Sequence, residues 1–220
     1  IRFGRWTGGV INVTDLSTGS SYVESLVAPS GAARSAQWVV AQVPSSLPLT
    51  GEFHYTRING ASGTPSFATA PTDSYGNVGT LDGARVSADF NNMKASAGFR
   101  IAMPSGPAGS LGMQNLSARF DNAPISNGGF NVSSSSNPAG SDNLHIACFG
   151  PGCAPDITLS SGSIVSAYGG RIRGGFDSAT GNAGTADGVF IRYTLDTLYG
   201  AYAVAPPAGR VVDDYINGLV

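Results

Sequence analysis

Apolar and polar residues alternate along much of this chain with a period of two, which is the spacing of a β-strand that buries one face. The clearest example runs from Val86 to Phe90, where Val86, Ala88 and Phe90 share one face while Ser87 and Asp89 share the other. A pair of asparagines follows and separates this segment from a second apolar-rich run. We therefore predict a β-hairpin here.

The same pattern returns at 116–120, where it is again followed by a turn pair, Asp-Asn, and by an apolar run at 130–132. We interpret the two units as successive hairpins built on one template. If these hairpins are neighbours, the outward residues Asp89 and Arg119 face each other across strands. The predicted inward face consists of Val86, Ala88, Phe90, Leu116, Ala118 and Phe120.

Most of the remaining chain also predicts short strands. Further strands are expected at 9–14, 37–43, 52–58, 143–148, 156–159, 163–168, 170–176 and 189–195, the last two forming a hairpin. Near the end, apolar residues at 211, 212, 215, 216 and 219 have helical spacing and predict a short C-terminal helix. Two segments rich in small and turn-forming residues, 59–79 and 133–141, are expected to be long loops.

Many turns and few helices place the chain in the all-β class. Glycine and proline together number 44, from 31 and 13, in 220 residues, which is well above average usage. About ten to twelve strands joined by turns fit a barrel or a sandwich. Repeated adjacent hairpins favour an antiparallel up-and-down β-barrel, with a Greek-key sandwich as the alternative. No boundary is evident, so residues 1–220 are expected to form one domain.

The charge and the hydropathy of the chain limit the classes of partner that we expect. Charged residues make up 12% of the chain, the net charge is −2, and a single lysine, Lys94, accompanies eleven arginines. We therefore expect no nucleic-acid partner, because binding nucleic acid takes a strongly basic face. No run of 18 apolar residues predicts a transmembrane helix. Because the chain starts Ile1-Arg2 without an initiator methionine, we expect a mature chain or an excised domain.

The two cysteines, Cys148 and Cys153, are separated by Phe-Gly-Pro-Gly. A metal half-site or a thioredoxin-type redox pair would have two intervening residues instead of four. We interpret the pair as a short disulfide that closes a turn, which favours an oxidising compartment.

No catalytic motif is present. The chain lacks G-x-S-x-G, a P-loop, a dinucleotide fingerprint and H-E-x-x-H. The only histidines, His54 and His145, lie in separate predicted strands, and His54 is expected to point outward, opposite to Phe53 and Tyr55. We predict no bound metal, no cofactor and no enzyme activity, with a glycosidase using paired carboxylates as the enzymatic alternative.

One loop offers a candidate contact. Tyr75, with Asp73 beside it, lies in the turn-rich segment 72–77, and binding residues concentrate in loops on a rigid scaffold. Packing within the turn is the alternative role for both residues.

Several short glycine-rich motifs follow one another in an order that resembles a known module. They are Gly4-Arg5-Trp6-Thr7-Gly8-Gly9, Gly51-Glu52-Phe53-His54-Tyr55, Pro71-Thr72-Asp73, the run 76–81, Ala88-Asp89-Phe90, the run 170–176 and Tyr193. The order resembles the β-barrel module at the C-terminal end of some bacterial FecR-domain proteins. It is similar, more distantly, to the barrel lobes of transferrin-binding protein B and related surface lipoproteins.

The resemblance covers most of residues 1–200. It implies an eight-stranded barrel with flanking strands, in the periplasm or at the outer surface of a Gram-negative cell. It transfers no binding residues, because variable loops hold the partners in that superfamily. We therefore expect an extracytoplasmic, non-enzymatic binding or sensing module of an envelope protein, which contacts a protein partner or small ligand through its loops. The alternative is a structural module that assembles a larger envelope protein.

Overall fold

The computed structural model describes residues 2–14, 19–27, 35–56, 69–134, 144–178, 181–208, 210 and 215–219. These residues form an all-β structure, as predicted, with one 3-10 turn, η1 (Pro107–Gly109). No helix within these ranges is long and apolar enough to cross a membrane. The strands are β1 (Arg2–Thr7), β2 (Val10–Thr14), β3 (Ser21–Ser25), β4 (Ser35–Val40), β5 (Glu52–Thr56), β6 (Thr69–Asp73), β7 (Thr80–Asp89), β8 (Lys94–Ser105), β9 (Gly112–Pro124), β10 (Gly129–Ser133), β11 (Leu144–Phe149), β12 (Ile157–Thr158), β13 (Ile164–Val165), β14 (Tyr168–Asp177), β15 (Gly188–Thr197) and β16 (Tyr215–Leu219).

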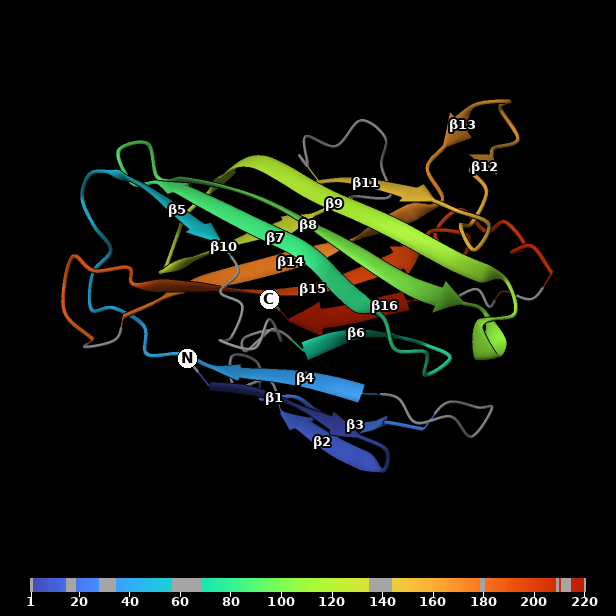
Figure 1. The fold of residues 1–220 in the computed structure, drawn as a ribbon, viewed down its shortest axis with the longest axis horizontal. Helices are drawn as coiled ribbons and strands as arrows, with labels where there is room; N and C mark the ends of the chain where they lie inside the picture. Colours follow the sequence, from blue (N-terminus) through green and yellow to red (C-terminus); the bar gives the residue numbers. More distant parts are fainter. Residues whose placement is uncertain are drawn as a thin grey trace.

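Two five-stranded antiparallel sheets dominate the fold (Figure 1). The first sheet has the strand order β11-β9-β8-β7-β5, and the second has the order β10-β14-β15-β16-β6. Figure 1 shows the green and yellow strands of the first sheet lying over the orange and red strands of the second. Two smaller ladders, β1-β4 and β2-β3, come from the N-terminal segment, and β4 packs against β16.

The core lies between the two five-stranded sheets and is filled largely by aromatic rings. All six residues of the predicted inward face are buried, as the alternation requires. Rings from opposite sheets meet in the interior: the centroids of Phe99 and Tyr193 lie 4.5 Å apart, and those of Phe90 and Phe176 lie 5.2 Å apart. These separations are those of direct ring contact. Side chains therefore occupy the space between the sheets.

The ladders formed by the described residues do not show a closed barrel. They join the strands into two separate sheets, so the arrangement is closer to the sandwich alternative. The second predicted hairpin is wrong, because β10 leaves β9 and pairs with β14 in the opposite sheet. Asp89 and Arg119 do not face each other, since β8 lies between their strands: Asp89 is opposite Lys94, and Arg119 is opposite Gly98.

The predicted C-terminal helix is wrong for the residues that the structure describes. Tyr215–Leu219 form β16, which pairs with β15 on one side and with β6 on the other. Ile216 and Leu219 are both buried, and Gly218 lies against the ring of Tyr193. A short strand with apolar residues on both faces does not alternate, which explains the misleading spacing. Residues 211–214 lie outside the described part of the chain.

The two predicted loops have different outcomes. The segment 59–79 contains a strand, β6, which lies at the edge of the second sheet and includes Pro71. Residues 57–68 and 135–143, which make up much of the two segments, lie outside the described residues. The hairpin predicted at 170–176 and 189–195 is confirmed as the pair β14 and β15.

Candidate functional site

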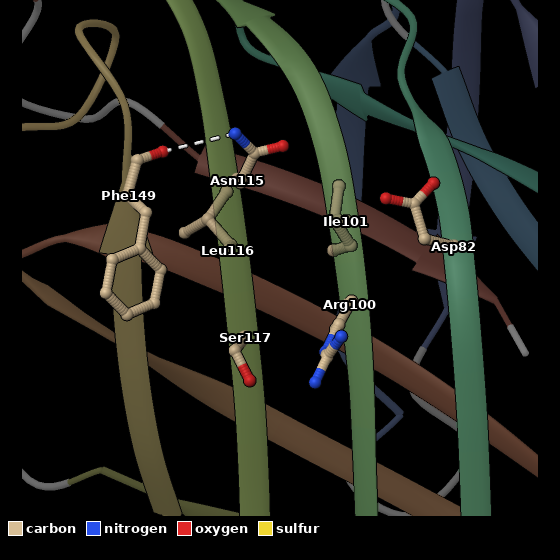
Figure 2. Close-up of a pocket in the computed structure, with 7 residues that line it drawn as sticks. All are labelled: Asp82, Arg100, Ile101, Asn115, Leu116, Ser117 and Phe149. Carbon is tan, nitrogen blue, oxygen red and sulfur yellow. Dashed lines mark hydrogen bonds between the residues drawn. The ribbon is translucent and has the colours of Figure 1, made fainter.

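A groove of about 410 Å³ crosses the outer face of the first sheet, near the end of β11 (Figure 2). Four strands contribute to it, namely β7, β8, β9 and β11. Its lining residues are Asp82, Arg100, Ile101, Asn115, Leu116, Ser117 and Phe149.

The floor of the groove follows from the pairing of β8 with β9. Ile101 and Leu116 are direct cross-strand partners and are buried, so they close the groove toward the core. Arg100 and Ser117 are the next pair and alternate to the outer face. Because Arg100 is exposed and its partner is a small serine, its guanidinium stands over an open surface.

A β-bulge places Asp82 at the groove. The pairing of β7 with β8 shifts between Leu81 and Gly83, which leaves Asp82 as the extra residue. Such bulges redirect a side chain that regular alternation would place elsewhere. The hydroxyl of Thr80 donates a hydrogen bond to Asp82 Oδ1 at 3.0 Å and holds the carboxylate at the sheet surface.

Phe149 forms the opposite wall and is 65% exposed. It ends β11, and its carbonyl oxygen accepts a hydrogen bond from Asn115 Nδ2 at 3.4 Å, as Figure 2 shows. An exposed aromatic side chain held by a paired backbone offers a ring face to a ligand.

The predicted disulfide lies immediately beyond this wall. The sulfur atoms of Cys148 and Cys153 are 2.01 Å apart, and the turn between them docks on β9 through a hydrogen bond from Gly152 N to Met113 O at 2.9 Å. The disulfide and this hydrogen bond therefore hold the chain that follows Phe149.

A buried hydrogen-bond chain fixes the segment after the disulfide. The backbone N–H of Ala154 donates to Tyr168 Oη at 2.7 Å, and that hydroxyl donates to Gln114 Oε1 at 3.2 Å. Satisfied polar networks of this kind rigidify their surroundings.

The charges of the groove can bind a ligand but do not form an acid–base pair. Arg100 makes no hydrogen bond or ion pair with any other described residue, so its donors face solvent. Asp82 is the one carboxylate among the lining residues. Hydrolysis by paired carboxylates uses two such groups. The arrangement supports binding of a polar or anionic group at Arg100, with an apolar or ring portion against Phe149.

The two residues selected from the sequence lie in another turn. Asp73 is buried, and its carboxylate accepts hydrogen bonds from Tyr75 N at 3.0 Å, Asn77 N at 2.8 Å and Asn77 Nδ2 at 2.8 Å. Asn77 Nδ2 also donates to Gly106 O at 2.8 Å and ties the turn to the segment after β8. Asp73 thus serves the turn, and Tyr75 is half-buried beside it. Neither residue lines the groove.

The two histidines do not converge. His54 lies on β5 and His145 on β11, at opposite edges of the first sheet. His54 points outward, as predicted, and its Nε2 is 3.6 Å from Glu52 Oε1. No group of three or more His, Cys, Asp or Glu side chains that could hold a metal ion occurs among the described residues.

Comparison of the chain with family models, with curated proteins and with solved structures found no match. The resemblance to FecR-associated and transferrin-binding barrels therefore rests on the short sequence motifs alone.

Sequence reasoning missed the groove because its residues come from four strands. Asp82 and Arg100 resemble ordinary solvated positions of an alternating strand. One local signal was available: Phe149 directly follows Cys148, so an aromatic residue stands beside a covalently fixed turn.

Proposed function

We propose that this chain is a non-enzymatic, extracytoplasmic binding or sensing module of a bacterial envelope protein. Its contact surface is the groove beside the disulfide turn, where Arg100 and Phe149 hold a small polar ligand or the side chain of a protein partner. The observation that carries the proposal is the combination of an aromatic-filled interior with this groove on the outer face.

The filled interior argues against a ligand carried between the sheets. Small β-barrels and sandwiches hold a ligand internally only where side chains leave room. Here the rings of Phe99 and Tyr193 stack across the interior. Binding is therefore assigned to the surface, where an unpaired guanidinium and an exposed ring provide charge and apolar contact.

The disulfide supports an extracytoplasmic location. Disulfides persist in oxidising compartments and are rare in the cytosol. The bridge between Cys148 and Cys153 also orders the groove wall, so the same bond supports both the proposed location and the proposed site.

The test is native mass spectrometry of the protein recovered from its own host envelope, comparing the wild type with the double variant R100A/F149A. A bound mass or a co-purifying partner that the wild type retains and the variant loses would support the proposal. R119A/I164A is the matched control, because it also removes one exposed arginine and one exposed apolar side chain outside the groove. A bare chain mass for all three proteins, with no partner, would contradict the proposal.

A second candidate is a structural module that assembles a larger envelope protein. The N-terminal strands favour it, because they expose large apolar side chains, and contiguous exposed apolar surface marks interaction sites. Trp6, Val10, Val23 and Val40 are 53%, 65%, 67% and 62% exposed. Sedimentation velocity over a range of concentrations tests this role: association that W6S/V40S abolishes supports it, and a monomer at every concentration speaks against self-assembly.

A further inference from the structure

The outer face of the second sheet carries three exposed arginines, Arg171, Arg173 and Arg192, which we name the arginine face. Arg171 and Arg173 alternate on β14 around Ile172, which is fully buried. Arg192 lies on β15 directly opposite Arg173. Because residues i and i+2 of a strand are about 7 Å apart and paired strands about 5 Å apart, the three guanidiniums share one small area.

This arrangement works against folding. Like charges directly opposite each other in a sheet are destabilising. None of the three guanidiniums has a hydrogen bond or an ion pair with a described residue. Asp196 lies four positions along from Arg192, toward the end of β15, and is half-buried. Asp177 lies four positions along from Arg173, is buried, and accepts a hydrogen bond from Gln42 N at 2.8 Å.

The net charge of the chain makes a cluster of three arginines unexpected. The protein as a whole is acidic, with a net charge of −2. An unpaired group of three cations on one face of an acidic protein is the arrangement expected where an external anion completes the charge. Arginine is suited to this role, because its planar guanidinium binds carboxylate, sulfate or phosphate through two parallel hydrogen bonds.

The neighbours of the arginine face indicate the class of anion. Asn131 lies opposite Arg173 and Thr194 lies opposite Arg171, and neither side chain has a hydrogen bond with another described residue. Amide and hydroxyl groups beside the cations provide partners for hydroxyl groups as well as for acids.

No large apolar side chain is fully exposed on the described part of this face, where the ring of Phe190, which shares the face with Arg192, is half-buried over Gly175. The large apolar side chains that are exposed in the structure lie elsewhere, and none belongs to β10, β14, β15 or β16. Protein interfaces bury aromatic anchors at their centre, and peripheral membrane binding combines cations with inserted apolar groups. A flat face of cations, amides and hydroxyls fits instead a polyhydroxylated polyanion.

We propose that the arginine face binds an acidic polysaccharide, with carboxylate or sulfate groups on Arg171, Arg173 and Arg192 and sugar hydroxyls on Asn131 and Thr194. This surface lies on the sheet opposite to the groove, so it adds a second binding site and does not depend on the ligand of the groove.

The experiment measures the affinity of the whole chain for immobilised polygalacturonate as a function of salt, with neutral dextran as the uncharged reference. R173Q/R192Q is expected to bind about tenfold more weakly and to show a shallower salt dependence, since an exposed ion pair contributes up to about fivefold. R85Q/R119Q is the matched control, because it removes two exposed arginines from the outer face of the first sheet, where they lie on either side of Gly98 and are not direct cross-strand partners of each other. It is expected to retain the wild-type affinity within about twofold.

Stability gives an independent readout. R173Q/R192Q removes a like-charge pair and is expected to unfold at or above the wild-type temperature, so weaker binding would not reflect unfolding. Equal losses in the two double variants would overturn the assignment to the arginine face. Failure of the wild type to bind polygalacturonate would overturn the polysaccharide, as would binding to phosphatidylglycerol vesicles alone.

Discussion

Replacing Gly174 with alanine adds a single methyl group at the most crowded point of β14. Gly174 is the direct cross-strand partner of Phe130 on β10. A Cβ atom at position 174 would lie 2.5 Å from Cε2 of that ring and still closer to Cζ. Carbon atoms in favourable contact are about 3.5–4.0 Å apart. The ring would therefore have to move by about 1 Å or more.

The ring has little room to move. Phe130 is buried, with its centroid 5.3 Å from that of Phe120 and 6.1 Å from that of Phe176. Overpacking of this kind costs about 1–3 kcal/mol. Alanine recovers roughly 0.5–1 kcal/mol, because glycine is the poorer residue within a strand. We expect G174A to lose about 1–2 kcal/mol of unfolding free energy, or roughly 2–8 °C in Tm for a chain of this size.

A double-mutant cycle in urea isolates the cause. The truncation F130L leaves space where the methyl group would go, so G174A in the F130L background should cost less than about 0.5 kcal/mol. Gly83 is the control position, because it lies in β7 with no atom within 4 Å of an added Cβ, and G83A should leave stability unchanged or slightly raised. The reasoning is refuted if G174A is as stable as the wild type, or if its cost is the same with Phe130 and with leucine.

Three further predictions concern the disulfide, the hydroxyl of Tyr55 and the turn that follows Asp89. Replacing Cys148 and Cys153 with serine should cost about 2 kcal/mol in urea unfolding, as expected for so short a closed loop, and no loss would show that the bridge does not restrict the unfolded chain. Burial raises the pKa of Tyr55 to about 12, so the stability that the protonated Tyr55 hydroxyl contributes should be lost as the pH rises from about 10 through 12. The phenolate absorbance of the wild type minus that of Y55F should show one tyrosine that titrates late, and titration near 10 would contradict this. A hydrogen bond from the side chain of Asn92 lowers the pKa of Asp89, so N92A should raise that pKa in an NMR titration. The wild type should be more stable than N92A above the pKa of a free carboxyl group, and this difference in stability should be lost as the pH falls through the lowered pKa.

The repeated motif shows both how far the sequence could predict the fold and where it could not. Alternation identified the buried faces of β7 and β9 correctly. The two copies nevertheless end differently. In the first copy the carboxylate of Asp89 accepts hydrogen bonds from Asn91 N at 2.9 Å and Asn92 N at 3.2 Å, which forms the turn.

The second copy has Arg119 at the position of Asp89, and an arginine has no acceptor for those N–H groups. The chain instead stays extended to Pro124. Asn122, with φ of 58°, forms part of a bulge, and its N–H donates a hydrogen bond to Ser96 Oγ at 3.0 Å. The exchange of Asp89 for Arg119, one of three differences between the two copies, therefore accompanies the change from a hairpin to a long strand.

Other misses arise from long-range pairing. β6 resembles a loop because it contains Pro71 within a threonine-rich segment, and it forms a strand only at the edge of a sheet that late residues complete. The groove was equally inaccessible, since Asp82, Arg100 and Phe149 meet only after four strands take their register. The disulfide could be predicted because its signal is local.

The pairing of β16 with β6 joins segments that are far apart in the sequence, so the β6 edge can form its ladder only late. β7, β8 and β9 pair with their neighbours along the chain, so their contacts close short loops at small entropic cost. By contrast, the hydroxyl of Thr72 reaches Asn217 across a sequence separation of 145 residues. A chain emerging from the ribosome therefore carries the β6 edge unpaired until residues 215–219 have been made. Pro71 lies in that edge and has no N–H group, which hinders pairing of the edge with other chains until residues 215–219 have been made.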